Sequence, residues 1–240
     1  MKLKKYGYTL TEVLLALAIV GVISVILIPN FATNAMKSRS AATLGRAVRQ
    51  IESGAMAIIQ NFNENTLNNG NANDNGSGSI SYTDSLSVAL NSTAGITGQI
   101  HTLGLAQNTS CKNPSIFEFN SQNVYNPGND FTCYKFTKFQ AEVYMNNIKP
   151  VNLGNATQPI SDIYIDTNGF RKRPNQLGKD IFWFTLFDNA KMVPHGAISD
   201  MSNDTAVNAS HLGTCTEGNV GDGTTCAASV VADGFKITYY

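Results

Sequence analysis

The N-terminal part of the chain is a long apolar run. No charged residue occurs from Val13 to Met36, and Val13–Ile28 is almost wholly apolar. Together with Tyr8–Thr11, this stretch reaches the ~20 residues that an α-helix needs to cross the hydrocarbon of a bilayer. The pattern therefore predicts a membrane-crossing helix over residues 8–29. Lysines precede this run, and positive charge marks the cytoplasmic side, so we expect the rest of the chain to be exported.

A helical pattern resumes after Pro29. Apolar residues recur at alternating four- and three-residue steps, which is the spacing of one helix face, at Leu44, Val48, Ile51, Ala55, Ile58 and Phe62. We expect residues 30–62 to be an amphipathic continuation of the first helix that packs on a globular head. Pro29 lacks a backbone N–H donor and predicts a kink or local melting. The polar stretch Asn61–Ser79 predicts a surface loop.

The remainder of the chain alternates strand-like segments with turns. The strand-like segments are rich in aromatic and β-branched residues and comprise Ile116–Phe119, Phe131–Phe139, Ile160–Asp166, Ile181–Phe187 and a final strand, Phe235–Tyr240. Asp188-Asn189 predicts a tight hairpin leading into Ala190–Val193. A long helix followed by such strands predicts an α+β fold, in which the helix packs on an antiparallel sheet within a head of residues 63–240.

Charge and cysteine content narrow the classes of function. The 17 Lys and Arg residues balance 17 Asp and Glu residues. The chain thus lacks the basic surplus used to bind phosphates, and no nucleic-acid partner is expected. Four cysteines without a CxxC pair argue against zinc and favour two disulfides in an oxidising compartment. Three connectivities are open, of which we prefer the sequence neighbours, Cys111–Cys133 and Cys215–Cys226.

No catalytic constellation stands out. The histidines are His101, His195 and His211. They lie outside any metalloprotease, serine-hydrolase or phosphate-loop motif, so we expect no enzyme activity, no cofactor and no metal. Asp166, Asn168 and Asp180 carry hard oxygen atoms but lack the dense spacing of a calcium loop. We interpret them as turn-forming residues, with a calcium site as the alternative.

The start of the apolar run resembles a known processing signal. The hexapeptide Gly7-Tyr8-Thr9-Leu10-Thr11-Glu12 is similar to the signal of type IV prepilins and type II secretion pseudopilins. In that family a short basic leader, here residues 1–7, ends in a glycine, and a prepilin peptidase cuts behind it. The resemblance implies cleavage between Gly7 and Tyr8, N-methylation of Tyr8, and a glutamate, Glu12, as the fifth residue of the mature chain. Tyr8 replaces the usual Phe and keeps an aromatic ring.

The resemblance also implies a function and a set of partners. Gly21 and Pro29 match common pilin positions and mark the predicted helix kink. The chain is expected to be a structural subunit of a pilus or pilus-like filament, in which Glu12 pairs with a neighbour's new N-terminal amine and sets the register. Implied partners are copies of the chain, other pilin subunits, the prepilin peptidase, the inner-membrane assembly platform, and membrane lipid before assembly.

The expected location follows from the same signal. The precursor would be a single-pass protein of the bacterial inner membrane with an exported head, and the mature subunit would lie in an extracellular filament or at the cell surface. Two alternatives stay open. A type II secretion pseudopilin would use the same signal, whereas a non-polymerising membrane-anchored receptor or adhesin would keep residues 1–7 and tolerate replacement of Glu12.

Overall fold

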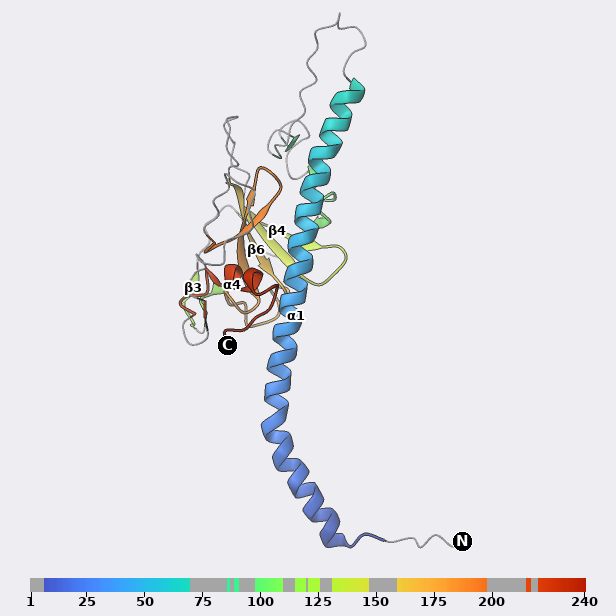
Figure 1. Ribbon diagram of the computed structural model, residues 1–240, viewed down its shortest axis with the longest axis vertical. Coiled ribbons are helices and arrows are strands. Elements are labelled where there is room, and N and C mark those ends of the chain that lie inside the picture. The colour runs from blue at the N-terminus through green and yellow to red at the C-terminus, as the bar shows by residue number, and fades with distance from the viewer. Residues whose placement is uncertain are drawn as a thin grey trace, which may run out of the picture. The chain divides into compact units, whose positions relative to one another are not determined.

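The computed structural model describes residues 7–69, 86, 89–90, 98–109, 115–119, 121–125, 131–146, 159–197, 215–216 and 220–240. The chain divides into two compact units, Met1–Arg39 and Ser40–Tyr240. One helix, α1 (Leu10–Asn69), forms the described secondary structure of the first unit and opens the second (Figure 1).

Helix α1 is longer than the sequence pattern predicted. Residues 61–69, expected in a polar loop, continue the helix, and the rest of that expected loop lies outside the described residues. The segment contains neither Gly nor Pro. Adding one residue to a formed helix costs little compared with starting a new one, so the helix extends beyond its apolar stripe.

The front of α1 differs in two ways from expectation. Residues 8–29 were predicted to cross a membrane. Within the part of the chain that the structure describes, no helix is both long enough and apolar enough to do so. The helix also runs through Gly21 and Pro29 without a break, so the local melting predicted at Pro29 is not found. A proline removes only one backbone donor, and the helical turns on either side persist. A kink at Gly21 or Pro29 stays a prediction.

The predicted apolar stripe on the back half of α1 is confirmed. Its buried members are Ala41, Leu44, Ala47, Val48, Ile51, Ala55, Ile58 and Ile59. They belong to the main core cluster, and Phe62 packs against it from a partly buried position. Gly54 allows a close approach of the turn before the first strand of the head, because a Cβ there would lie 2.6 Å from the Cα of Leu103.

The head contains a six-stranded antiparallel sheet with the strand order β1-β4-β5-β6-β7-β8. The strands are β1 (Leu105–Gln107), β4 (Phe131–Phe136), β5 (Glu142–Asn146), β6 (Pro159–Asp166), β7 (Ile181–Phe187) and β8 (Met192–Pro194). From β4 to β8, neighbours in sequence are neighbours in the sheet, which makes a meander, and β1 pairs with β4 at one edge. A separate two-stranded sheet joins β2 (Ile116–Phe117) to β3 (Val124–Tyr125).

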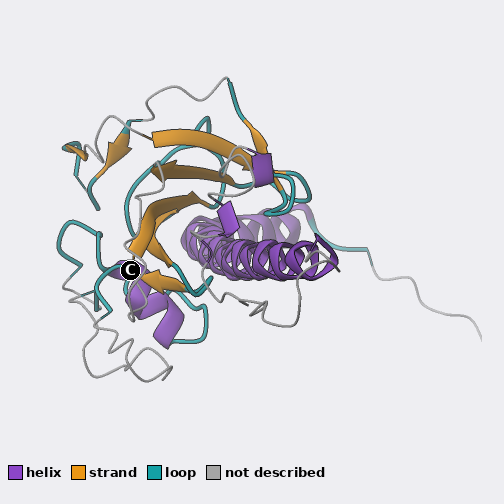
Figure 2. Cartoon of the chain, turned by 90° about the horizontal axis from the view of Figure 1, so that it is seen from above, coloured by secondary structure: helices purple, strands orange, loops and turns teal. Residues whose placement is uncertain are grey.

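Successive side chains of the sheet point to opposite faces, and both faces are buried. Val143 of β5 and its partner Ile165 of β6 belong to the core cluster that includes the α1 stripe. Tyr144 and its partner Tyr164 belong to a second cluster on the other face. Figure 2 shows the strands curving along one side of the helix, which places the main core between the sheet and the back half of α1.

The predicted α+β fold is confirmed, and the individual strands were predicted unevenly. The segments expected around β2, β4, β6 and β7 are strands, and the predicted hairpin joins β7 to β8. Strands β1, β3 and β5 were missed because two are only two or three residues long and the third begins with a charged residue. Helix α4 (Cys226–Ala232), a short run of small and β-branched residues, was also missed.

The predicted final strand, Phe235–Tyr240, was wrong. These residues form no regular element, although their burial alternates as in a strand. Ile237 and Tyr239 are buried in the core, and Thr238 between them is exposed. Alternating burial requires only a packed surface on one side, whereas a strand also requires a neighbouring backbone for its hydrogen bonds. The end of the chain has a packed surface on one side but no neighbouring strand with which to form a ladder.

Candidate functional site

The predicted cleavage site lies just outside helix α1. Gly7, Tyr8 and Thr9 precede the helix, and the side chain of Tyr8 is 86% exposed. The preceding leader residues 1–6 lie outside the described residues. The Gly7–Tyr8 bond is therefore free of helical hydrogen bonding and open to an approaching enzyme.

Thr9 and Glu12 form a reciprocal cap at the start of the helix. The carbonyl oxygen of Thr9 accepts the first helical hydrogen bond, from the N–H of Val13 at 3.2 Å. The Thr9 hydroxyl oxygen accepts from the N–H of Glu12 at 3.3 Å, and the Thr9 N–H donates to Glu12 Oε2 at 2.8 Å. The Thr9 hydroxyl also donates to Glu12 Oε2, at 2.8 Å. This arrangement is a capping box, so the Glu12 carboxylate is held at the positive end of the helix.

Thr9 is the residue of this site that was not predicted from the sequence. The spacing Thr9-x-x-Glu12 directly before an apolar run is the sequence signature of a capping box. The resemblance to prepilins gives Glu12 only a partner on another chain. In the isolated chain, Thr9 already supplies two hydrogen-bond donors to it.

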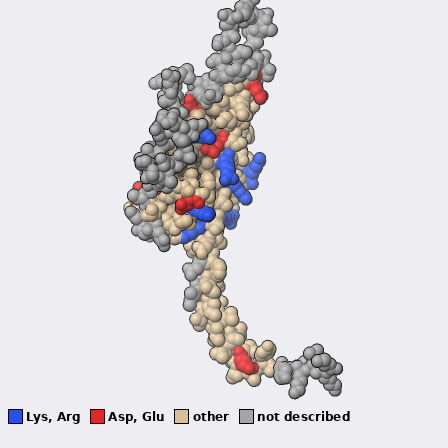
Figure 3. Space-filling view, viewed as in Figure 1, with Lys and Arg blue, Asp and Glu red and all other residues tan. Residues whose placement is uncertain are grey.

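The front half of α1 exposes its apolar side chains all around the helix. Leu17 is 63% exposed and Val25 is 75% exposed, and they are representative of the large apolar side chains described between Leu10 and Phe31. A soluble surface helix normally confines such residues to one stripe. In Figure 3 the front part of the helix shows no lysine or arginine on the face in view. An exposed apolar surface of this kind marks a contact with another molecule or with lipid.

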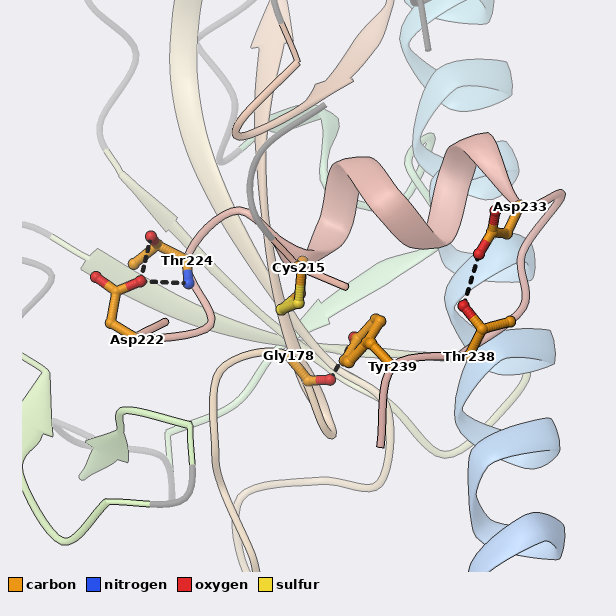
Figure 4. The surroundings of a disulfide bond; sticks show 8 residues. Gly178, Cys215, Asp222, Thr224, Asp233, Thr238 and Tyr239 are labelled. Carbon is orange, nitrogen blue, oxygen red and sulfur yellow. Dashed lines mark hydrogen bonds between the residues drawn. A yellow bond between two sulfur atoms is a disulfide. The ribbon is translucent and has the colours of Figure 1, made fainter. Parts of the chain in front are cut away.

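A disulfide joins Cys215 to Cys226 at the start of α4 (Figure 4). The two Cα atoms are 4.9 Å apart, and the cysteines are 11 residues apart in sequence. Gly178 lies against this bond, because a Cβ there would come within 2.7 Å of Cys226 Sγ. The hydroxyl of Tyr239 donates to the carbonyl oxygen of Gly178, which ties the chain end to the same place. Cys133 is also disulfide-bonded, and Cys111 lies outside the described residues.

Two aspartates organise the loop between β6 and β7. Asp166 Oδ1 accepts from the N–H groups of Asn168 and Gly169 at 3.0 and 2.8 Å. Asp180 Oδ2 accepts from Asn168 Nδ2 at 2.9 Å and from the N–H of Asn175 at 2.8 Å. These residues therefore shape the turns, as predicted. Burial, with the charge of Asp180 nearby, raises the pKa of Asp166 to about 8, and burial also raises the pKa of Asp180.

Among the described residues, no three side chains of His, Cys, Asp and Glu come together so as to hold a metal ion. His195 stacks on Trp183 with ring centroids 3.5 Å apart, and burial lowers its pKa. His101 is exposed, and His211 lies outside the described residues.

Comparison with known families gives one match. Residues 2–28 match the family described as the prokaryotic N-terminal methylation motif, which is the type IV pilin and pseudopilin signal. Comparisons with curated proteins and with solved structures find no match. The motif supports a type IV pilin-like or pseudopilin precursor, and it points to a structural protein and not to an enzyme. It implies processing by a prepilin peptidase and assembly with other pilins.

Proposed function

We propose that this chain is the precursor of a structural subunit of a type IV pilus or a related extracellular filament. A prepilin peptidase cuts between Gly7 and Tyr8, and the new amine of Tyr8 is methylated. One observation supports the proposal most strongly: the methylation motif occupies the same segment in which apolar side chains are exposed all around the helix.

The exposed front half of α1 supplies the free energy of assembly. Burying a Leu, Ile or Val side chain contributes roughly 1.5–3 kcal/mol. The head buries the stripe on the back half of the helix, whereas the large apolar side chains described in the front half are exposed. We propose that lipid of the inner membrane covers the front half in the precursor and that the helices of neighbouring subunits cover it in the filament. The exported head then lies on the filament surface.

Glu12 gives the assembly its register. Within a bundle of apolar helices, an unpaired carboxylate is costly, and breaking a buried ion pair costs roughly 3–5 kcal/mol. In the isolated chain, Glu12 Oε2 is occupied by the two donors of Thr9. The methylated amine of a neighbouring Tyr8 is the positive partner that a correctly placed subunit brings to Glu12. A subunit displaced along the axis leaves the carboxylate without that partner.

Mass spectrometry of the N-terminal peptide, from protein isolated from its own cells, tests the proposal. The expected peptide begins at Tyr8 and carries one methyl group. The same cells without their prepilin peptidase serve as the control and should yield residues 1–7 still attached. If residues 1–7 are retained in the unmodified cells as well, the chain is a membrane-anchored receptor or adhesin and does not enter a filament by this route.

A further inference from the structure

The β4–β5 and β6–β7 connections lie at the same end of the six-stranded sheet. Lys135 of β4 faces Glu142 of β5, and Glu142 faces Asp166 of β6. These three residues form one row across the sheet. The two connections, residues 137–141 and 167–180, both begin or end next to this row, so they leave the sheet on the same side of it.

Basic side chains at this end of the sheet face the solvent. All of them except the half-buried Lys179 are exposed, and we call these exposed residues the basic end of the head: Lys135, Lys138, Arg171, Lys172 and Arg173. In the part of the chain that the structure describes, no carboxylate forms an ion pair with any of the five. Their charge is therefore available to a partner outside the chain.

The acidic side chains at the same end are used inside the head. Asp166 and Asp180 are buried, and both oxygens of Asp180 accept from backbone N–H groups. Glu142 is half-buried, with Oε1 accepting from Asn108 Nδ2 at 2.9 Å and Oε2 from the N–H of Phe170 at 3.0 Å. The acids thus hold the β6–β7 loop in place while the bases point outward. This end of the surface is positive although the whole chain has no net charge.

Helix α1 meets the head at this basic end. The Ser40 hydroxyl shares a hydrogen bond with the Thr167 hydroxyl and donates to the carbonyl oxygen of Lys179 at 3.1 Å. Both partners belong to the β6–β7 connection. Ser40 comes four residues after Met36, where the uncharged stretch of the helix stops. Four residues span about 6 Å along an α-helix.

That spacing brings the basic end within reach of a membrane surface. Attraction between basic side chains and anionic lipid falls off within a Debye length, about 8 Å at physiological ionic strength. Clusters of roughly four to eight lysines and arginines beside a membrane-embedded helix are typical of sites for anionic lipid headgroups. The basic end has five such residues and lies where the uncharged stretch of α1 stops.

We propose that the basic end docks on anionic phospholipid headgroups in the exported leaflet of the inner membrane while the precursor is anchored there. This inference rests on the part of the proposed function that places lipid around the front half of α1. The contact holds the head against the membrane before assembly. Because it is electrostatic, it is weakened by salt and breaks when the subunit leaves the membrane for the filament.

Labelling of lysines in the full chain, reconstituted in vesicles, tests the docking surface. The vesicles are phosphatidylcholine alone or phosphatidylcholine with about 30% phosphatidylglycerol, and flotation confirms that the chain is bound. A water-soluble amine acetylating reagent is applied briefly, and mass spectrometry gives the rate at each lysine. Lys138 and Lys172 should react about threefold or more slowly in the anionic vesicles, and about 0.5 M NaCl should remove the protection. Lys191, an exposed lysine in the β7–β8 hairpin at the opposite end of the sheet, is the internal control and should react equally in both.

Charge variants separate the basic end from the rest of the surface. Replacing Arg171, Lys172 and Arg173 together by Glu should abolish the protection of Lys138 in anionic vesicles. Arg171→Gln with Arg173→Gln is the milder variant should the triple change disturb folding, and it should reduce the protection. Lys191→Glu makes the same change of charge at the opposite end and should leave the protection of Lys138 as in wild type. Thermal unfolding of each variant shows whether the head is still folded.

Each remaining outcome decides against the proposal in a distinct way. A chain that floats with the vesicles but labels equally at Lys138 and Lys191 in both lipids overturns the docking surface and leaves the proposed function standing. A chain that does not float overturns both. Equal protection in phosphatidylcholine alone shows that anionic headgroups are not the ligand. Protection of Lys138 by a short DNA duplex, without protection by anionic vesicles, assigns the surface to nucleic acid instead.

Discussion

The two halves of α1 contain the same kinds of apolar side chain in opposite environments. In the front half Leu17 and Val25 are exposed, whereas in the back half Leu44 and Ile51 are fully buried. The difference lies in how polar residues are distributed around the helix. The back half places Arg46 and other polar residues on its outer face and leaves one stripe for the core. The front half has no charged residue from Val13 to Met36 and therefore no charged face.

The two halves of the helix therefore differ in what their apolar side chains can stabilise. The back half stabilises its own head, since its stripe contributes to the main core cluster. No described side chain of the front half belongs to that core. We propose that its free energy of burial becomes available on contact with lipid or with other chains. Substitutions in the front half should therefore affect assembly, whereas substitutions in the back half should affect the stability of the head.

The largest expected effect is the loss of assembly without loss of the fold. Glu12→Ala removes the carboxylate that we propose pairs with a neighbour's Tyr8 amine, and it should abolish filaments while leaving membrane insertion and the head intact. Electron microscopy of sheared surface material, with cell fractionation, measures both. Thr11→Ala, an exposed change in the same helical turn, should assemble normally. Normal filaments from Glu12→Ala would show that register does not depend on this charge.

A matched pair of isoleucines tests the division between the halves directly. Ile51→Ala removes a fully buried side chain and should lower the free energy of unfolding of the head by about 2–5 kcal/mol, through lost burial and a residual cavity. Ile19→Ala, at an exposed position of the front half, should change it by less than about 0.5 kcal/mol. Denaturant unfolding followed by Trp183 fluorescence provides the measurement. A similar loss of unfolding free energy in both variants would contradict the difference between the two halves.

Removing the disulfide tests the stability of the head without changing the front half of α1. Replacing Cys215 and Cys226 together by Ala should cost about 3 kcal/mol, because the bond restricts an 11-residue segment of the unfolded chain. Filament formation at low temperature should persist, since the front half is untouched. The measurement is the same denaturant titration, with Thr216→Ala as an exposed control beside the bond. An unchanged midpoint in the double variant would mean that the bond does not stabilise the head.

The smallest expected effect is a pH dependence confined to the head. Burial lowers the pKa of His195 below its usual 6.5, so protonation favours the unfolded chain. Its contribution is full above pH 6.5 and is lost as the pH falls through the lowered pKa. His195 is only half-buried, so the loss should stay below about 1 kcal/mol. The difference in unfolding free energy between pH 7.5 and 5.5 should be larger for wild type than for His195→Asn, and an equal difference would contradict it.

Features that depend on near neighbours were predictable. The stripe at Leu44, Val48 and Ile51 follows from helical periodicity, and the strands around Ile181–Phe187 follow from their aromatic and β-branched content. Both signals are read within one element. The capping role of Thr9 was equally local, and its spacing to Glu12 was available in the sequence. The short strands β1 and β3 were not predictable, because two or three residues carry no period and gain their pairing only from the sheet that they join.

The order of residues alone was enough to identify a methylation motif near the start of the chain, an apolar stretch without charge from Val13 to Met36, and an amphipathic stripe after it. These are properties of side-chain order along one helix, and no distant contact alters them. Three other features depend on tertiary contacts: Cys215 pairs with Cys226, the chain end packs without becoming a strand, and Asp166 lies fully buried beside Asp180 and Glu142. Each of these depends on segments far apart in sequence meeting at one place, because burial and pairing belong to the packed assembly of elements and not to any one of them.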